Sequence, residues 1–235
     1  GDVYKRQTLI DSFAHEAFRR RQVDQVFRTK LHDLYDQGRA SGLAAEQALV
    51  DPLAVVLASP GFLYLSEAEE AGAKRRPLTQ REIAVRLSYF LWSAPPDEAL
   101  YQAAESGTLK NSAELTRQVD RMLADPRAEA FYHSFLSQWF ELHRFDDIAV
   151  NPDEYLMFDE QVRYSAREEP IRLFEHLVKE NLSLANLIDS EFAMLDPLLA
   201  HFYGIKGVEG QGFRKVNLPP ESPRGGLLGT TAFMI

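Results

Sequence analysis

Cysteine is absent from the 235 residues of this chain. Its absence excludes disulfide bonds, thiol catalysis, cysteine-ligated zinc and a CxxCH haem-attachment site within the sequence. The redox compartment stays open, because an exported protein need not contain disulfides. Long apolar runs are also missing: no stretch reaches about 18 apolar residues, so we expect no membrane-spanning helix.

The chain also lacks clusters of positively charged residues. The chain has 26 Lys and Arg against 35 Asp and Glu, a net charge of -9. Binding to phosphate backbones needs clustered basic side chains. The runs Arg19–Arg21 and Lys74–Arg76 are too short to change the balance. We therefore expect no nucleic-acid partner.

Helical patterns dominate what is present. Hydrophobic residues make up 45% of the chain and charged residues 26%, which is typical of a folded protein. Apolar residues recur at helical spacing, as from Val23 to Tyr35, and Thr79–Glu82 has the pattern of a capping box. The sequence predicts a mostly α fold, a multi-helix array with short helices and at most a minor β element near the C-terminus, at Phe213–Leu218. The residues predicted to be buried together are Ile83, Leu87, Leu91, Leu123, Phe135 and Trp139.

Composition along the chain suggests several segments. The first residues resemble a translated sequencing-adapter remnant, and the last ones stop inside an apolar pattern. We interpret the chain as an internal fragment of a longer protein. The predicted segments are 1–7 as an adapter-derived artefact, 8–65 as an N-terminal helical module, 66–78 as a linker, 79–205 as a central helical module and 206–235 as the truncated start of a third module.

Short motifs in a fixed order point to a family. They are RLSYFLW at Arg86–Trp92, RMLADPRA at Arg121–Ala128, QWF at Gln138–Phe140 and HFYGI at His201–Ile205. This order resembles the planctomycete-type domains of unknown function found together in very large bacterial proteins. Residues 13–64 are similar to the module numbered fifteen-ninety-five in the DUF series and residues 78–205 to fifteen-ninety-two. Residues 213–229, which end in RGGLLG, resemble the start of fifteen-eighty-eight.

The resemblance implies a cellular context. It implies a large exported protein, periplasmic or at the cell surface, that often carries c-type haem in other domains. The implied partners are the other domains of the same polypeptide. No cofactor is expected in this chain. The resemblance implies no activity and no catalytic residues.

One short segment is a candidate binding site. Arg224, Gly225 and Gly226 precede an apolar run, and two glycines suit a tight approach to a helix start, where free N–H groups and the arginine can hold an anion. The alternative is a turn between two modules in which Arg224 pairs with a carboxylate. We favour the turn.

Other patterns are interpreted as structural. His176 and Glu180 have metal-ligand spacing on one helix, but nothing specifies further ligands, and the ion pairs Glu168–Arg172 and Glu175–Lys179 favour a solvated face. Aromatic residues at helical spacing can form a ligand or sugar platform, yet they are more often core. An acidic loop can bind calcium but lacks EF-hand spacing. We therefore predict no metal site. The aromatic residues are Tyr89, Phe90, Trp92, Phe131, Phe135, Trp139 and Phe140, and the loop residues are Asp146, Asp147, Asn151 and Asp153.

No GxSxG, P-loop, HExxH or dinucleotide fingerprint occurs in the sequence. The hypothesis is accordingly a non-catalytic helical scaffold or interaction module of a large exported, haem-associated protein. The alternative is a fragment of an enzyme, such as a hydrolase, with its site at the junction of the second and third modules. The catalytic residues of such an enzyme stay unknown.

Overall fold

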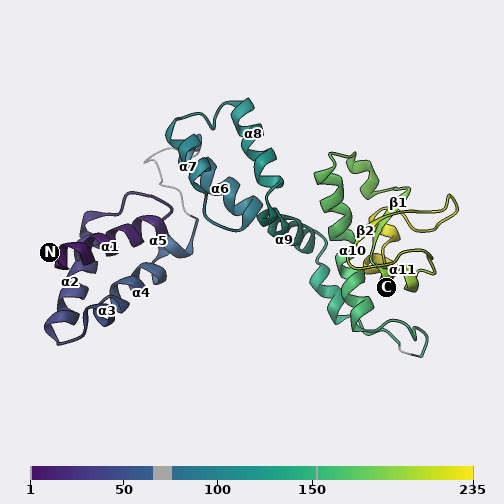
Figure 1. Cartoon of the computed structure of the whole chain (residues 1–235), viewed down its shortest axis with the longest axis horizontal. Helices are drawn as coiled ribbons and strands as arrows, with labels where there is room; N and C mark the ends of the chain where they lie inside the picture. The colour runs from purple at the N-terminus through teal and green to yellow at the C-terminus, as the bar shows by residue number, and fades with distance from the viewer. Residues whose placement is uncertain (1, 66–75, 152, 235) are drawn as a thin grey trace. The chain divides into compact units, whose positions relative to one another are not determined.

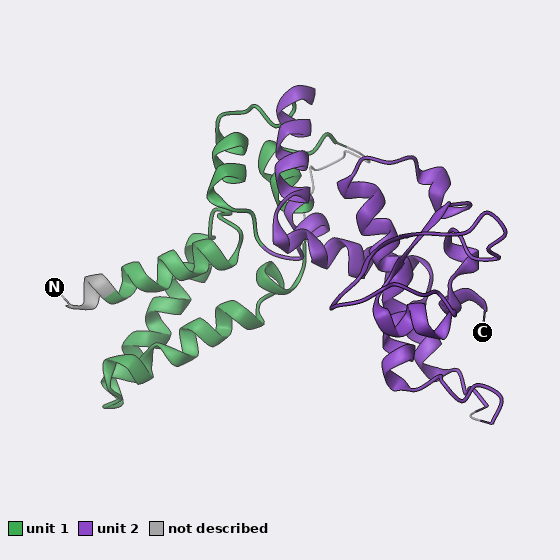
Figure 2. Cartoon of the chain, turned by 45° about the vertical axis from the view of Figure 1, so that its right-hand side comes forward, with its two compact units in different colours: residues 1–86, 95–110 green, residues 87–94, 111–235 purple. Residues whose placement is uncertain are grey.

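The computed structural model describes residues 2–65, 76–151 and 153–234, and of residues 2–5 the backbone alone. Its contacts divide the chain into two compact units (Figure 2). Unit 1 comprises residues 1–86 and 95–110, and unit 2 comprises residues 87–94 and 111–235. Helices make up most of the secondary structure, which confirms the predicted mostly α fold (Figure 1).

The first helices of unit 1 begin and end at local signals. Asp24 caps α2, because its side chain accepts the N–H groups of Val26 and Phe27 at 2.9 and 3.1 Å. Apolar spacing predicts one helix from about Ala44 through Leu57, but it is interrupted at Leu49. Pro52 lies in the first turn of α4, where a missing N–H costs no helical hydrogen bond. The elements are α1 (Asp2–Ala17), α2 (Gln25–Ala40), α3 (Ala45–Ala48), α4 (Val50–Ala58) and α5 (Pro60–Leu63).

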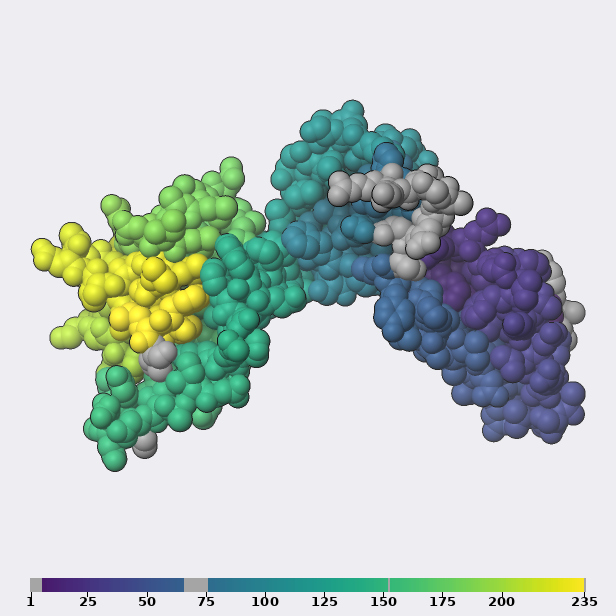
Figure 3. All heavy atoms as spheres, turned by 180° about the vertical axis from the view of Figure 1, so that it is seen from behind, coloured from purple at the N-terminus to yellow at the C-terminus, as the bar shows by residue number. Residues whose placement is uncertain are grey.

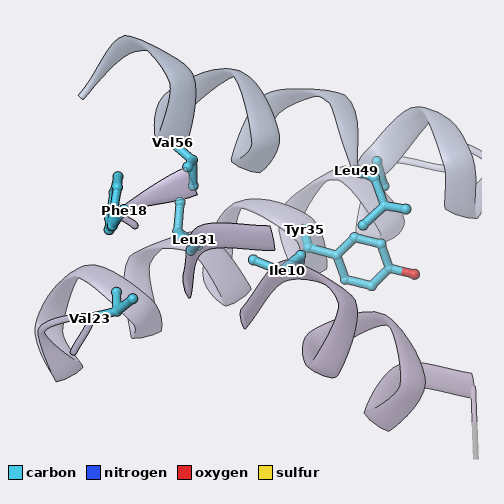
Figure 4. Close-up of a cluster of buried hydrophobic side chains, with 9 residues drawn as sticks. Ile10, Phe18, Val23, Leu31, Tyr35, Leu49 and Val56 are labelled. Carbon is cyan, nitrogen blue, oxygen red and sulfur yellow. The ribbon is translucent and has the colours of Figure 1, made fainter. Parts of the chain in front are cut away.

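The apolar faces of these helices form one core cluster (Figure 4). Ile10 of α1, Leu31 of α2 and Val56 of α4 have no exposed surface. Burying each such side chain contributes roughly 1.5–3 kcal/mol. The helical spacing of apolar residues in the sequence therefore corresponds to real packing in this part of unit 1.

The capping box predicted at Thr79–Glu82 is present. The N–H of Glu82 donates to Thr79 Oγ1 at 3.2 Å, and the N–H of Thr79 donates to Glu82 Oε2 at 2.8 Å. It starts α6 (Gln80–Trp92), which stops before Pro95 and Pro96. The next helix, α7 (Glu98–Glu105), starts at its cap Asp97.

A long helix, α10 (Glu160–Lys179), is the centre of unit 2, and α9, α11, α12 and β1 all contact it. Proline removes a helical hydrogen bond, so the sequence predicts a bend or restart at Pro170. The helix does not restart there: it is one continuous element with Pro170 inside it and buried. Packing on several sides can offset the hydrogen bond that proline removes. The remaining elements of unit 2 are α8 (Ser112–Leu123), η1 (Pro126–Ala128), α9 (Glu129–Trp139), η2 (Leu142–Asp147), η3 (Leu184–Leu187), β1 (Phe192–Leu195), α11 (Pro197–Phe202), β2 (Arg214–Asn217), η4 (Leu227–Gly229) and α12 (Thr231–Met234).

The β element is a two-stranded antiparallel sheet in which β1 pairs with β2. Phe192 lies opposite Asn217, and Leu195 lies opposite Arg214. Strand β2 falls within the predicted Phe213–Leu218. Strand β1 was not predicted, because its four residues are all buried and have no alternating pattern.

The predicted common core is wrong in part. Leu91 is buried, but Trp139 is 56% exposed, and Ile83 belongs to unit 1 whereas the other five residues belong to unit 2. The buried positions of α9 are Tyr132 and Leu136 instead. Phe135 and Trp139 of α9 therefore share one face of the helix, as predicted from their spacing. The face buried by the rest of unit 2 is a different one. Leu87, Leu123 and Phe135 are partly buried.

Two further expectations concern larger features. Within the described residues, no helix combines the length and the apolar character needed to cross a membrane. The segment boundaries drawn from the sequence stay a prediction, and most of the linker, residues 66–75, lies outside the described residues.

Candidate functional site

Gly225 and Gly226 lie where the segment after β2 passes close to the turn that precedes β1. Gly226 has φ +64, and a Cβ built on it would lie 2.4 Å from the carbonyl oxygen of Ile188. A Cβ on Gly225, at φ +139, would lie 2.5 Å from the carbonyl oxygen of Ser190. The glycines are therefore needed for a close approach of two backbones.

Arg224 lies over an aromatic ring. Its guanidinium carbon is 3.7 Å from the ring centroid of Tyr203, and Nη1 donates to the carbonyl oxygen of Gly229 at 3.1 Å. The same nitrogen is 3.5 Å from Thr231 Oγ1. These contacts hold the C-terminal segment to α11, and anion binding by Arg224, Gly225 and Gly226 stays a prediction.

The hydroxyl of Tyr203 contacts a buried carboxyl group. The Tyr203 hydroxyl donates to Glu169 Oε2 at 2.5 Å and accepts from the backbone N–H and the hydroxyl of Thr231, at 3.1 and 2.8 Å. Glu169 is 2% exposed and Thr231 also 2%. One hydroxyl thus connects α10, the end of α11 and the start of α12. In the space-filling view the C-terminal residues, in yellow, lie against green residues of unit 2 (Figure 3).

Burial sets the acid–base properties of this cluster. It raises the pKa of Glu169 from 4.5 to about 8, although the Tyr203 hydrogen bond and the charge of Arg224 act in the opposite direction. Asp196 adds a smaller effect that raises the same pKa. Burial, followed by the charge of Glu169, raises the pKa of Tyr203. Glu169 can therefore hold a proton near neutral pH, but its burial keeps it from direct contact with a dissolved substrate.

The predicted ion pairs on α10 are confirmed. Arg172 Nη2 lies 3.0 Å from Glu168 Oε2, and Lys179 Nζ lies 2.7 Å from Glu175 Oε1. The face is not fully solvated as predicted, because Glu168 is only 3% exposed. Arg172 also reaches Glu129 of α9 at 3.0 Å, so the network links two helices.

The residues considered as metal ligands have other contacts. His176 packs edge-on against Phe192, with ring centroids 5.5 Å apart. In the acidic loop, Asp146 pairs with Arg167 at 2.6 Å, and Asn151 accepts the N–H of Asp153 at 3.1 Å. Asp146 and Asp147 belong to η2 rather than to a loop. Among the residues that the structure describes, no three His, Asp or Glu side chains are grouped to hold a metal ion.

The aromatic residues of α6 and α9 form a groove in unit 2. Phe90 packs on Phe131 with ring centroids 5.0 Å apart, Phe131 on Phe135 at 5.5 Å, and Phe135 on Trp139 at 5.3 Å. Phe90 is 58% exposed and Trp139 56%. The groove has a volume of about 540 Å³. The prediction that all these aromatics are core is wrong for Phe90 and Trp139.

Trp92 differs from this row. It is 3% exposed, its indole N–H donates to the carbonyl oxygen of Met122 at 2.9 Å, and the Arg127 guanidinium lies 3.5 Å from its ring centroid. The core interpretation holds for Trp92.

No motif or spacing in the sequence singles out Glu169 or Thr231. Tyr203 lies in the motif HFYGI, which marked it without assigning a role. No residue spacing connects these three positions, because they are distant in sequence and meet only through the packing of unit 2.

Two family models match the chain. The model PSD4, described as "Protein of unknown function (DUF1592)", matches residues 78–205. The model PSD5, described as "Protein of unknown function (DUF1595)", matches residues 5–67. No curated protein and no solved structure matches the chain. The two matches agree with the first two modules inferred from the sequence motifs.

Proposed function

Since the chain belongs to the family described as "Protein of unknown function (DUF1592)", which names no activity, we propose a function from the geometry. The chain is a non-catalytic helical interaction module of a larger polypeptide. Its aromatic groove docks another domain of that polypeptide. The observation that carries this proposal is the row of rings on α6 and α9, which ends in two aromatic side chains that are each more than half exposed.

Exposed aromatic rings in a groove are typical of interfaces. Trp, Tyr and Phe are enriched in the buried centres of protein–protein interfaces, and Trp is common among the residues that dominate binding energy. Phe90 and Trp139 are held at defined positions by Phe131 and Phe135, so a partner would not have to order them on binding.

The row also continues into the C-terminal segment of unit 2. Trp139 stacks on Phe140 with centroids 4.6 Å apart, and Phe140 packs edge-on against Phe233 of α12 at 5.2 Å. The segment predicted to start the third module, residues 206–235, therefore already contacts one end of the row. This continuity supports a domain of the same polypeptide as the occupant of the open part.

The wider context is part of the proposal. We propose that the parent polypeptide is exported and carries c-type haem in other domains, with no cofactor in this chain. The support is the resemblance of the sequence motifs. Fractionation of cells and haem staining of the parent polypeptide test it, and a cytoplasmic, haem-free parent would contradict it.

Titration calorimetry between this chain and the separately produced neighbouring domains of its parent tests the docking. We expect saturable binding that Trp139→Ser and Phe90→Ser each weaken about tenfold or more, because central aromatic residues dominate such interfaces. Leu156→Ser is the matched control, since Leu156 is 86% exposed and lies outside the groove. Equal effects of all three substitutions, or binding that none of them changes, would rule out the groove as the docking site.

A second candidate function is a fragment of an enzyme, such as a hydrolase, with its site at the junction of the second and third modules. The observation that favours it is the cluster of Glu169, Tyr203 and Thr231, which joins both predicted modules. Because Glu169 is buried, it would act through this cluster rather than on the substrate directly, and its pKa of about 8 suits proton transfer near neutral pH. If this candidate is right, Glu169→Gln abolishes turnover by the parent polypeptide while its thermal unfolding is retained. Unchanged turnover would exclude it.

A further inference from the structure

Unit 1 contains a cavity of about 680 Å³ with a strongly basic lining. The end of α1, the start of α2, the first turns of α6 and the residues after α5 all contribute to it. Six of its lining residues are arginines and two are carboxylates, in a chain whose net charge is -9. The basic residues that matter below are Arg19, Arg20, Arg28 and Arg81.

The turn after α1 brings two of these arginines into place. Arg19 and Arg20 both adopt left-handed conformations, with φ of 58° and 59°. Such conformations are unfavourable for residues other than glycine. Arg19 compensates by donating to the carbonyl oxygens of Gly61 and Phe62 at 2.9 and 2.6 Å, and it is 7% exposed. Arg19 therefore connects the turn after α1 to Gly61 and Phe62 and holds this side of the cavity in place.

Arg20 has acidic partners outside the cavity lining. It donates to Glu16 at 3.1 Å and to Glu98 at 2.9 Å, and its guanidinium lies 4.1 Å from the ring centroid of Tyr101. These contacts hold Arg20 beside the cavity and neutralise its charge. Arg20 therefore does not require a bound anion to balance its charge.

The two carboxylates of the lining also have partners. Glu82 accepts from both terminal nitrogens of Arg76 at 2.7 and 2.5 Å, which lowers its pKa to about 2. Asp11 Oδ1 lies 2.9 Å from His32 Nε2. Arg76 lies outside the lining and compensates Glu82, so Asp11 is the one lining carboxylate left to balance the six arginines.

Two arginines of the lining are compensated less than Arg20: Arg28 has one long ion pair, and Arg81 has none among the described residues. Arg28 Nε is buried, lies 3.7 Å from Asp11 Oδ1 and has no hydrogen-bond partner in the described part of the chain. Arg81 has no ion pair or side-chain hydrogen bond with any residue that the structure describes. A buried donor without a partner is unfavourable, so the described residues compensate neither arginine fully.

We propose that this cavity binds a small organic anion whose carboxylate or phosphate group is held by Arg28 and Arg81. Guanidinium groups match the geometry of both kinds of oxyanion. The apolar part of the ligand would contact Val23, Val85 and Tyr64, which line the same cavity. The volume falls within the range of about 300–1,000 Å³ typical of small-molecule sites.

Titration calorimetry on the 235-residue chain at low ionic strength tests this site. The probes are phenyl phosphate and benzoate, which separate phosphate from carboxylate recognition, and benzyl alcohol, which has the same ring without the charge. We expect saturable binding of at least one anion and none of the alcohol. Arg28→Gln and Arg81→Gln should each weaken the binding about tenfold or more, since each removes a charge-assisted hydrogen bond.

Lys30→Gln is the charge-matched control, because Lys30 is an exposed residue of α2 outside the lining. Thermal unfolding identifies any variant that has lost its fold. If Arg28→Gln is unfolded, the binding measured with Arg81→Gln tests the proposal. The proposal is overturned if neither anion gives a saturable signal at millimolar concentration. It is also overturned if Lys30→Gln weakens binding as much as Arg81→Gln, since the effect would then reflect net charge alone.

Discussion

Tyr203 donates a hydrogen bond to Glu169 Oε2 at 2.5 Å, although the carboxyl group is 2% exposed and 34 residues away in sequence. The same hydroxyl accepts two hydrogen bonds from Thr231, so its one donor and two acceptor positions are all used. Its ring also supports the guanidinium of Arg224. Tyr203 therefore joins α10 and α11 to the segment that contains the predicted anion site.

The raised pKa of Glu169 predicts a specific pH dependence of stability. Its pKa is 4.5 when unperturbed and about 8 in the fold. Below about pH 4.5 both states are protonated, and the stability associated with the neutral acid is fully present. Between pH 4.5 and 8 the unfolded chain releases the proton first, so the free energy of unfolding falls by up to about 1.4 kcal/mol per pH unit.

Glu169→Gln cannot ionise and should lose this dependence. Between pH 6 and pH 8 the free energy of unfolding of the parent chain should fall by at least about 1 kcal/mol more than that of the variant. Urea unfolding at the two pH values measures this difference. Glu160→Gln is the control on the same helix, since the Glu160 side chain is 93% exposed. A variant curve parallel to that of the parent chain would mean that Glu169 is ionised in the fold.

Tyr203→Phe keeps the ring beneath Arg224 but removes the hydroxyl. Glu169 and the two donors of Thr231 then lose their partner inside unit 2. We expect the free energy of unfolding to fall by about 1–3 kcal/mol. Tyr155→Phe, at a residue that is 47% exposed, should change it by less than about 0.5 kcal/mol. Urea unfolding measures both, and equal effects would refute the role of the hydroxyl.

Gly226→Ala tests the close approach of two backbones. The new Cβ would lie 2.4 Å from the carbonyl oxygen of Ile188 at φ +64. Gly204 is the matched control, because its φ is +72 and a Cβ there meets nothing within 4 Å. A positive φ strains alanine in both variants, and at Gly226 ψ is -176, a combination that only glycine adopts readily. We expect Gly226→Ala to cost at least about 2 kcal/mol more in urea unfolding than Gly204→Ala, since backbone has to move.

The predicted anion site can be tested by a phosphate titration followed by NMR at the amides of Gly225 and Gly226. We expect no saturable shift, because both glycines pack against backbone carbonyl groups and Arg224 lies over Tyr203. The amide of Gly204 serves as the reference for general salt effects. Saturable shifts at both glycines would support the anion site and contradict the turn interpretation.

Local signals in the sequence determined where most helices begin and end. The capping box at Thr79–Glu82 was predicted, because a cap involves residues within about four positions of each other. The caps Asp24 and Asn111 are equally local. The ion pairs on α10 were predicted for the same reason. Such features depend only on the geometry of the α-helix, which is the same in every protein.

Tertiary structure alone decided which faces are covered. The spacing of Phe131, Phe135 and Trp139 shows that they share a helical face, but only the packing of unit 2 leaves Trp139 exposed and buries Leu136. Strand β1 exists because β2, about twenty residues later, pairs with it. The raised pKa of Glu169 likewise depends on burial by residues that are distant in the chain. Burial and pairing depend on which distant segments meet, and local spacing does not specify that.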